Sequence, residues 1–122
     1  MIAKDTLPAQ AQQYPTAPLR IVVPYPPGAG NDVLGRHLAQ KLGPALGQIV
    51  IVENRAGASG AIGADFVAKS APNGCTLMFT SSSFATSAAA EIKLPFDPER
   101  AFAPVGVFGI SPKLLVIPPH CR

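Results

Sequence analysis

The stretch from Leu19 to Asp32, LRIVVPYPPGAGND, constrains the fold more than any other part of the chain. Within it, Ile21–Val23 is a short run of β-branched apolar residues, which is typical of a strand buried on both faces. Prolines then end the strand, because proline has no amide hydrogen for a sheet ladder. Glycines and a helical pattern follow, and we expect Asn31 or Asp32 to cap a helix that begins at Val33. Open α/β sheets bind ligands at such junctions, where the free amides of the helix start favour an anion.

Two further β-rich runs, Ile49–Val52 and Cys75–Thr80, are separated from the first by helical patterns. The order is therefore βαβαβ, which favours right-handed crossovers and a parallel sheet, so the predicted fold class is α/β. In a parallel sheet the loops that follow the strands share the carboxyl edge, where we expect them to line one crevice. These loops are Tyr25–Asp32, Arg55–Gly60 and Ser81–Thr86.

The helical patterns predict which side chains face the sheet. Leu34, Leu38 and Leu42 share one face of the first helix, which Pro44 is expected to end or kink and Gly47 to close. The second helix follows the turn Ala56–Gly60. Its expected inward residues are Ile62, Phe66 and Val67, and Asp65 and Lys69 are expected to form an i,i+4 ion pair.

Near the C-terminus, Val105–Ile110 and Leu114–Ile117 have the composition of two more strands. No helical pattern follows to cover them, so we expect an incomplete domain. The two cysteines, Cys75 and Cys121, lack metal-ligand spacing, and no disulfide can be inferred from them.

The glycine spacing Gly57-x-x-Gly60-x-x-Gly63 opens the second helix after a strand and has two interpretations. One is a small nucleotide-dependent α/β enzyme. Against it, the spacing is not G-x-G-x-x-G, and no acidic residue follows Thr80 to hold a ribose. The other interpretation is a tight turn with close helix packing.

Catalytic constellations are weak in this sequence. Ser81–Ser83 lacks a nucleophile elbow, His37 fits a structural position on a helix, and His120 lies near the end of the chain. Asp32 is the one acid expected at the crevice, where helix capping explains it better than catalysis does. We therefore expect no enzyme and no cofactor or metal, but a crevice of amides and hydroxyls that binds a small polar ligand without transforming it.

Composition excludes two classes of partner. Only 14% of the residues are charged, and the net charge of +3 is spread without a basic run, which argues against nucleic-acid binding. No apolar run approaches the roughly 20 residues that span a bilayer, so we expect no membrane insertion. At the N-terminus, Ala9-Gln10-Ala11 fits a signal-peptidase site, and Met1–Ala11 is either the remnant of a secretory leader or an ordinary tail.

Taken together in order, several motifs resemble the tripartite tricarboxylate transporter substrate-binding proteins, the TctC or Bug family of extracytoplasmic solute receptors. The resemblance runs from about Tyr14 to Ile117. Its main anchors are Pro24-Tyr25-Pro26-Pro27-Gly28 with Asp32, Leu46-Gly47-Gln48, Val52-Glu53-Asn54-Arg55 with Gly57, Ala71-Pro72-Asn73-Gly74, Leu94-Pro95-Phe96-Asp97 and Phe102-Ala103-Pro104-Val105.

The resemblance implies a two-lobed periplasmic binding protein of type II fold that closes on a small carboxylate and presents it to the subunits of a membrane transporter. It implies no cofactor and no reaction. Glu53, Asn54 and Arg55 are expected to fix the second loop. The ligand-binding residues that it implies, acting through amides, hydroxyls and bridging water, are Tyr25, Pro27, Gly28, Ala29, Gly30, Asn31, Asp32, Ser81, Ser82 and Ser83.

Family members are more than twice as long as this chain of 122 residues. The expected organisation is a leader remnant at 1–13, the first part of lobe 1 at 14–103, and truncated strands that enter the second lobe at 104–122. The tail Pro118–Arg122 departs from the family pattern as a truncated reading frame would. A non-functional remnant whose uncovered strands aggregate is therefore a third interpretation, beside the solute receptor and the nucleotide enzyme.

Overall fold

The computed structural model describes residues 14–90 and 93–111 and contains a three-stranded parallel sheet in the order β2-β1-β3. The strands are β1 (Leu19–Val23), β2 (Val50–Asn54) and β3 (Thr76–Met78). In register, Ile21 of the central strand lies opposite Val52 on one side and Leu77 on the other. The predicted βαβαβ order and the parallel sheet are confirmed, and Ile21, Val22 and Val23 are at most 1% exposed.

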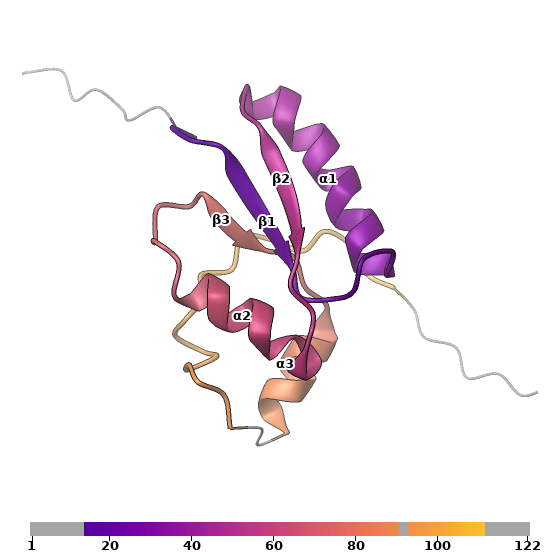
Figure 1. Cartoon of the computed structure of the whole chain (residues 1–122), viewed down its shortest axis with the longest axis vertical. Coiled ribbons are helices and arrows are strands. Elements are labelled where there is room, and N and C mark those ends of the chain that lie inside the picture. The colour runs from indigo at the N-terminus through magenta and orange to yellow at the C-terminus, as the bar shows by residue number, and fades with distance from the viewer. Residues whose placement is uncertain (1–13, 91–92, 112–122) are drawn as a thin grey trace, which may run out of the picture.

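Helices α1 (Gly30–Leu46) and α2 (Ala61–Ala68) pack on opposite faces of the sheet, as Figure 1 shows. Leu38 and Leu42 of α1 pack against the core of Ile21 and Val23, whose side chains point to the same face because side chains alternate along a strand. On the other face, α2 approaches Pro24 so closely that a Cβ atom at Gly63 would lie 2.9 Å from the proline Cβ. The first two crossovers therefore cover both sides of β1.

Three predictions about α1 need correction. The helix begins at Gly30 with Ala29 as its N-cap, so neither Asn31 nor Asp32 caps it. Leu34 is 45% exposed, because Gly35 and Ala39 form the buried stripe and allow the helix to lie close to the sheet. Pro44 lies inside the helix without ending it; proline removes one N–H bond, to the carbonyl of Gln40, and the helix ends two residues later at Leu46.

Two other features of the helices were predicted correctly. Gly47 closes α1 in the left-handed conformation, with φ 62°. On α2, Lys69 Nζ lies 2.7 Å from a carboxylate oxygen of Asp65, as the i,i+4 spacing indicates. The predicted inward position of Ile62 is wrong, because this side chain is 53% exposed while the small residues Gly63 and Ala64 are buried.

A third helix, α3 (Ser82–Ala89), follows β3 and was not predicted, because SSFATSAA carries no clear apolar period. Its aromatic residue Phe84 packs against Phe96 and Phe102, with ring centroids 6.5 and 5.7 Å apart. These contacts hold the segment around residues 94–102 against α3. A short 3-10 helix, η1 (Ala58–Gly60), precedes α2.

The strand predicted over Val105–Ile110 is not formed, and no other described segment supplies hydrogen-bond partners for its backbone. Val105, Val107 and Ile110 are 86–92% exposed, whereas Phe108 packs edge-on against Phe79 at 5.5 Å. A strand requires a neighbour for its N–H and C=O groups, so composition alone does not form one here. The predicted strand Leu114–Ile117, Cys121 and His120 lie outside the described residues.

Across residues 14–90 and 93–111, no helix is both long and apolar enough to cross a membrane.

Candidate ligand-binding site

The first and third loops meet through hydroxyl groups at the carboxyl edge of the sheet. The Tyr25 hydroxyl lies 2.8 Å from Ser83 Oγ, 3.0 Å from Ser81 Oγ and 3.1 Å from Thr80 Oγ1, and the two serine oxygens are 2.8 Å apart. Tyr25 reaches them because β1 and β3 are adjacent and parallel. Two predicted site segments, separated by more than 50 residues in sequence, therefore form one hydroxyl cluster: Tyr25, Thr80, Ser81 and Ser83.

The hydroxyl cluster has four donor hydrogens for its four short oxygen–oxygen contacts. Burial raises the pKa of Tyr25, but hydrogen bonds with Ser81, Ser83 and Thr80 outweigh it and leave the pKa below its ordinary value of 10.0. Each hydroxyl can turn from its neighbour to an incoming acceptor. The cluster is therefore suited to donate hydrogen bonds to ligand oxygen atoms.

Asp32 lies where the first loop enters α1, and it is only 4% exposed. Its Oδ1 accepts a hydrogen bond from Asn54 Nδ2 at 2.9 Å and lies 3.0 Å from Arg36 Nη2 in an ion pair. Its Oδ2 accepts from the Gly28 amide at 2.8 Å and from Arg36 Nε at 3.1 Å. The Arg36 guanidinium contacts both oxygens and so compensates the buried charge.

The remaining residues of the first loop present mainly backbone. Gly28 has φ +82°, a left-handed conformation that favours glycine, and the Ala29 amide donates to the Pro26 carbonyl at 3.2 Å. The amides of Gly30 and Asn31 have no hydrogen-bond partner among the described residues. Pro27, within the first loop, and Ser82, the first residue of α3, are exposed.

Asn54 has a role that the sequence pattern did not reveal. Its Nδ2 also donates to the Tyr25 carbonyl at 3.2 Å, so it fixes the first loop, not the second as expected. Arg55 fits the expectation, because its guanidinium stacks 3.6 Å from the Phe66 ring centre and pairs with Glu53 at 2.6 Å. The motif Glu53-Asn54-Arg55 therefore holds both loops.

The glycines at the end of the second loop and in the first turn of α2 serve packing. A Cβ at Gly63 would lie 2.8 Å from the Arg55 carbonyl oxygen, and Gly60 packs against Pro24 with φ +94°. These contacts support the tight-turn interpretation of the glycine spacing. The non-glycine residues Ala58 and Ser59 also have positive φ, of 46° and 54°.

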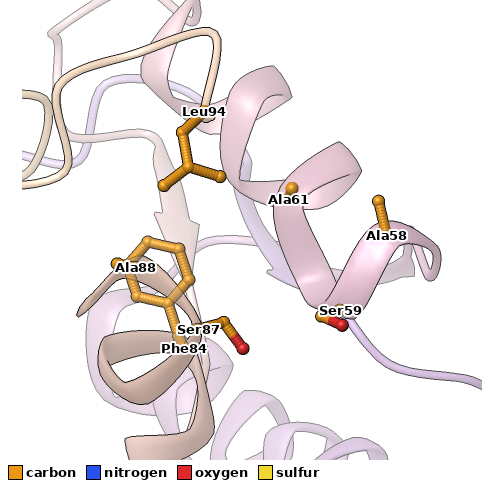
Figure 2. A pocket seen from close by; sticks show the side chains of 7 residues that line it. All are labelled: Ala58, Ser59, Ala61, Phe84, Ser87, Ala88 and Leu94. Atoms are coloured by element: carbon orange, nitrogen blue, oxygen red, sulfur yellow. The ribbon is translucent and has the colours of Figure 1, made fainter. Parts of the chain in front are cut away.

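A shallow pocket, which the sequence did not predict, lies between the second loop and α3. Figure 2 shows η1 and the start of α2 on one side, α3 on the other, and Leu94 above them. Most of the lining is apolar, with two serine hydroxyls at its edge. The lining residues are Ala58, Ser59, Ala61, Phe84, Ser87, Ala88 and Leu94.

The charged side chains around the loops are paired with one another. Arg36 pairs with Asp32 and Arg55 with Glu53, while His37 is exposed on α1. Within the described ranges there is no group of three or more His, Cys, Asp or Glu residues arranged to hold a metal ion. Neutral hydroxyl and amide donors are thus the principal binding groups that this edge of the sheet offers.

The Asp32 carboxyl is expected to make stability depend on pH in the acid range. Hydrogen bonds from Arg36, the Gly28 amide and Asn54 lower its pKa from 3.8 to about 2. The unfolded chain therefore takes up this proton at higher pH than the folded chain. The stabilisation is fully present above the ordinary pKa and disappears as the pH falls through about 2.

Urea midpoints of the wild type and Asp32→Asn, measured from about pH 6 down to about pH 2, check this expectation. The difference in urea midpoint between the two proteins should shrink below about pH 4. Val33→Ala, at a position 58% exposed, serves as a control whose gap stays constant. A gap for Asp32→Asn that is independent of pH would contradict the assignment of a depressed pKa.

A parallel α/β sheet whose carboxyl-end loops converge on neutral donors defines part of a ligand-binding lobe. The chain belongs to the TctC family, described as tripartite tricarboxylate transporter family receptors, whose pattern matches residues 34–121.

Two relatives illustrate this membership. The chain is 42% identical over 117 residues to Protein BugT of Bordetella pertussis, covering 94% of this chain and 36% of that protein. It is 34% identical over 122 residues to the UPF0065 protein in the tcbD-tcbE intergenic region of Pseudomonas sp. (strain P51), covering 100% of this chain and 36% of that protein. The chain thus spans about 36% of the length of these curated relatives.

Solved structures agree on the fold. One described as a periplasmic transporter superposes with a TM-score of 0.64 at 39% identity, over 70% of this chain and 29% of the other. The periplasmic binding protein BugD gives a TM-score of 0.51 at 42% identity, over 53% of this chain and 22% of the BugD chain. The fold is therefore the βαβαβ sheet portion of lobe 1 of a type II periplasmic binding protein.

Proposed function

We propose that this chain forms one wall of the ligand site of a periplasmic solute-binding protein that captures a small carboxylate and carries out no reaction. In this proposal, residues 14–103 belong to lobe 1 and residues 104–122 lead toward a second lobe. The bound carboxylate is presented to the membrane subunits of a tripartite tricarboxylate-type transporter. Membership of the receptor family and the likeness to periplasmic binding proteins support this assignment.

The observation that carries the proposal is the meeting of Tyr25 with Ser81 and Ser83 beside the open amides of Gly30 and Asn31. Hydroxyls and amides donate hydrogen bonds to carboxylate oxygens, directly or through water. The N-terminal end of the 17-residue α1 adds a favourable dipole for negative charge. The proposed contacts are those of Tyr25, Pro27, Gly28, Ala29, Gly30, Asn31, Ser81, Ser82 and Ser83, with Asp32 acting from beneath the loop.

Isothermal titration tests the proposal with two proteins, the 122-residue chain and a counterpart extended to the length of its relatives. Dicarboxylates, citrate and aromatic carboxylates are the probes. We expect the extended protein to bind at least one of them. The chain alone should bind about tenfold more weakly or worse, because closure around the ligand requires the opposing lobe.

A pair of tyrosine variants of the extended protein gives a matched control. Tyr25→Phe removes the central hydroxyl of the cluster and should weaken binding about tenfold. Tyr14→Phe removes a hydroxyl that donates to the Gly74 carbonyl, away from the site, and should leave affinity unchanged. Failure of the extended protein to bind any carboxylate would refute the proposed function, and tight binding by the short chain would refute the need for a second wall.

A further inference from the structure

The Asp32 carboxylate is fully engaged within the protein. It accepts three hydrogen bonds, from Asn54 at Oδ1 and from Gly28 and Arg36 at Oδ2, and its Oδ1 also forms an ion pair with Arg36 Nη2. A carboxylate oxygen has about two strong acceptor positions, and at each oxygen of Asp32 two protein groups lie within 3.1 Å. With 4% exposure, the side chain lacks the access that direct contact with a ligand requires.

The partners of Asp32 lie on both sides of the two consecutive prolines of the first loop. The Gly28 amide after Pro27 donates directly to Asp32 at 2.8 Å. The Tyr25 carbonyl before Pro26 accepts from Asn54 Nδ2, the same nitrogen that donates to Asp32. Pro26 and Pro27 have no amide hydrogen, so these two bonds are important anchors for this stretch of backbone.

Arg36 completes the arrangement. Its guanidinium binds both carboxylate oxygens and also donates from Nη2 to Asn54 Oδ1 at 3.0 Å. The amide of Asn54 is thereby held in the orientation that places its nitrogen between Asp32 and Tyr25. A negative charge near the start of α1 would repel an anionic ligand, and the bidentate guanidinium offsets that charge.

We propose that Asp32 is a positioning residue, which acts through Gly28, Asn54 and Arg36 to hold the first loop in the shape that carries Tyr25 to the hydroxyls of the third loop. It sets the geometry of the site without touching the ligand. The expected effect of Asp32 on ligand affinity rests on the proposed function. Its effect on the conformation of the first loop is a property of the unliganded chain.

Amide hydrogen exchange of the unliganded 122-residue chain, resolved by residue, tests the loop directly. In Asp32→Asn, the Gly28 amide should exchange about tenfold faster than in the wild type, because an amide side chain has one acceptor oxygen where the carboxylate has two. The amides of Val22 and Val23 should change much less. Asp65→Asn breaks a different carboxylate pair, on α2, and should leave Gly28 unaffected.

Arg36→Gln gives a second variant in case Asp32→Asn fails to fold, since the Arg36 side chain is half exposed and Gly28 keeps its partner. It should accelerate Gly28 exchange by a smaller factor. Unchanged exchange at Gly28 in both variants, or equal acceleration along β1, would overturn the proposal.

Titration of the extended protein with a carboxylate that its wild type binds supplies the functional readout. Asp32→Asn should weaken binding while Asp65→Asn does not, and unchanged affinity despite a loosened loop would also overturn the positioning role. Failure of the wild-type extended protein to bind any carboxylate would contradict the proposed function and not the positioning role. The hydrogen-exchange experiment would still decide the role of Asp32 in the loop.

Discussion

Ile21→Ala is expected to lower the free energy of unfolding by about 2–5 kcal/mol, the range for truncating a buried isoleucine. Ile21 is 1% exposed and lies in the central strand, between Val52 and Leu77 of its two neighbours. It belongs to the core cluster that packs beneath α1. Because small domains have total stabilities of about 5–15 kcal/mol, this single truncation should remove a large part of the free energy of unfolding.

Urea denaturation followed by circular dichroism measures the change, with Ile49→Ala as the matched control. Ile49 precedes β2 and is 67% exposed, so its truncation should cost less than about 0.5 kcal/mol. Equal effects of the two substitutions would mean that β1 is not the centre of the fold in solution. That result would favour an aggregating remnant over a folded lobe.

The three strands of the sheet could be predicted because their signal is local. Ile21–Val23 is apolar at every position and is bounded by prolines, which leaves little choice other than a buried strand. The alternation of strands with helical patterns then determines that the sheet is parallel, and a parallel sheet brings the first and third loops to one edge. The meeting of Tyr25 with Ser81 and Ser83 follows from that topology.

Features that depend on tertiary contacts could not be predicted in this way. Leu34 has the same helical spacing as Leu38 and Leu42, and only the close approach permitted by Gly35 and Ala39 decides which stripe is buried. α3 lacks an apolar period and is held by aromatic packing of Phe84 with distant residues.

The role of Asp32 was hidden for the same reason. An acid just after a glycine turn is a good helix cap by pattern, and no local signal shows that it binds Asn54 at the end of β2. The bond from Asn54 to the Tyr25 carbonyl likewise joins residues 29 positions apart. Sequence reasoning could place these residues at the same edge of the sheet, but it could not identify which of them bind one another.

Gly63→Ala is the second substitution with a large expected effect, about 1–3 kcal/mol of lost stability from overpacking. The new methyl group would lie 2.8 Å from the Arg55 carbonyl oxygen and 2.9 Å from the Pro24 Cβ, and backbone cannot yield as a flexible side chain can. To relieve these contacts, α2 must move away from the end of β1, which would also displace the second loop.

Gly30→Ala is the control that separates steric overlap from a general effect of losing glycine. Gly30 has nothing within 4 Å of the added atom, so the substitution should be neutral or stabilise by up to about 1 kcal/mol through helix propensity. Thermal unfolding of the unliganded chain compares the two variants. A large loss at Gly63 alone, with no nucleotide present, means that packing is enough to require this glycine. Equal stability of both variants would instead favour a ligand-binding role for the Gly57–Gly63 spacing. That role predicts that the purified protein retains a nucleotide and that Gly60→Val loses it.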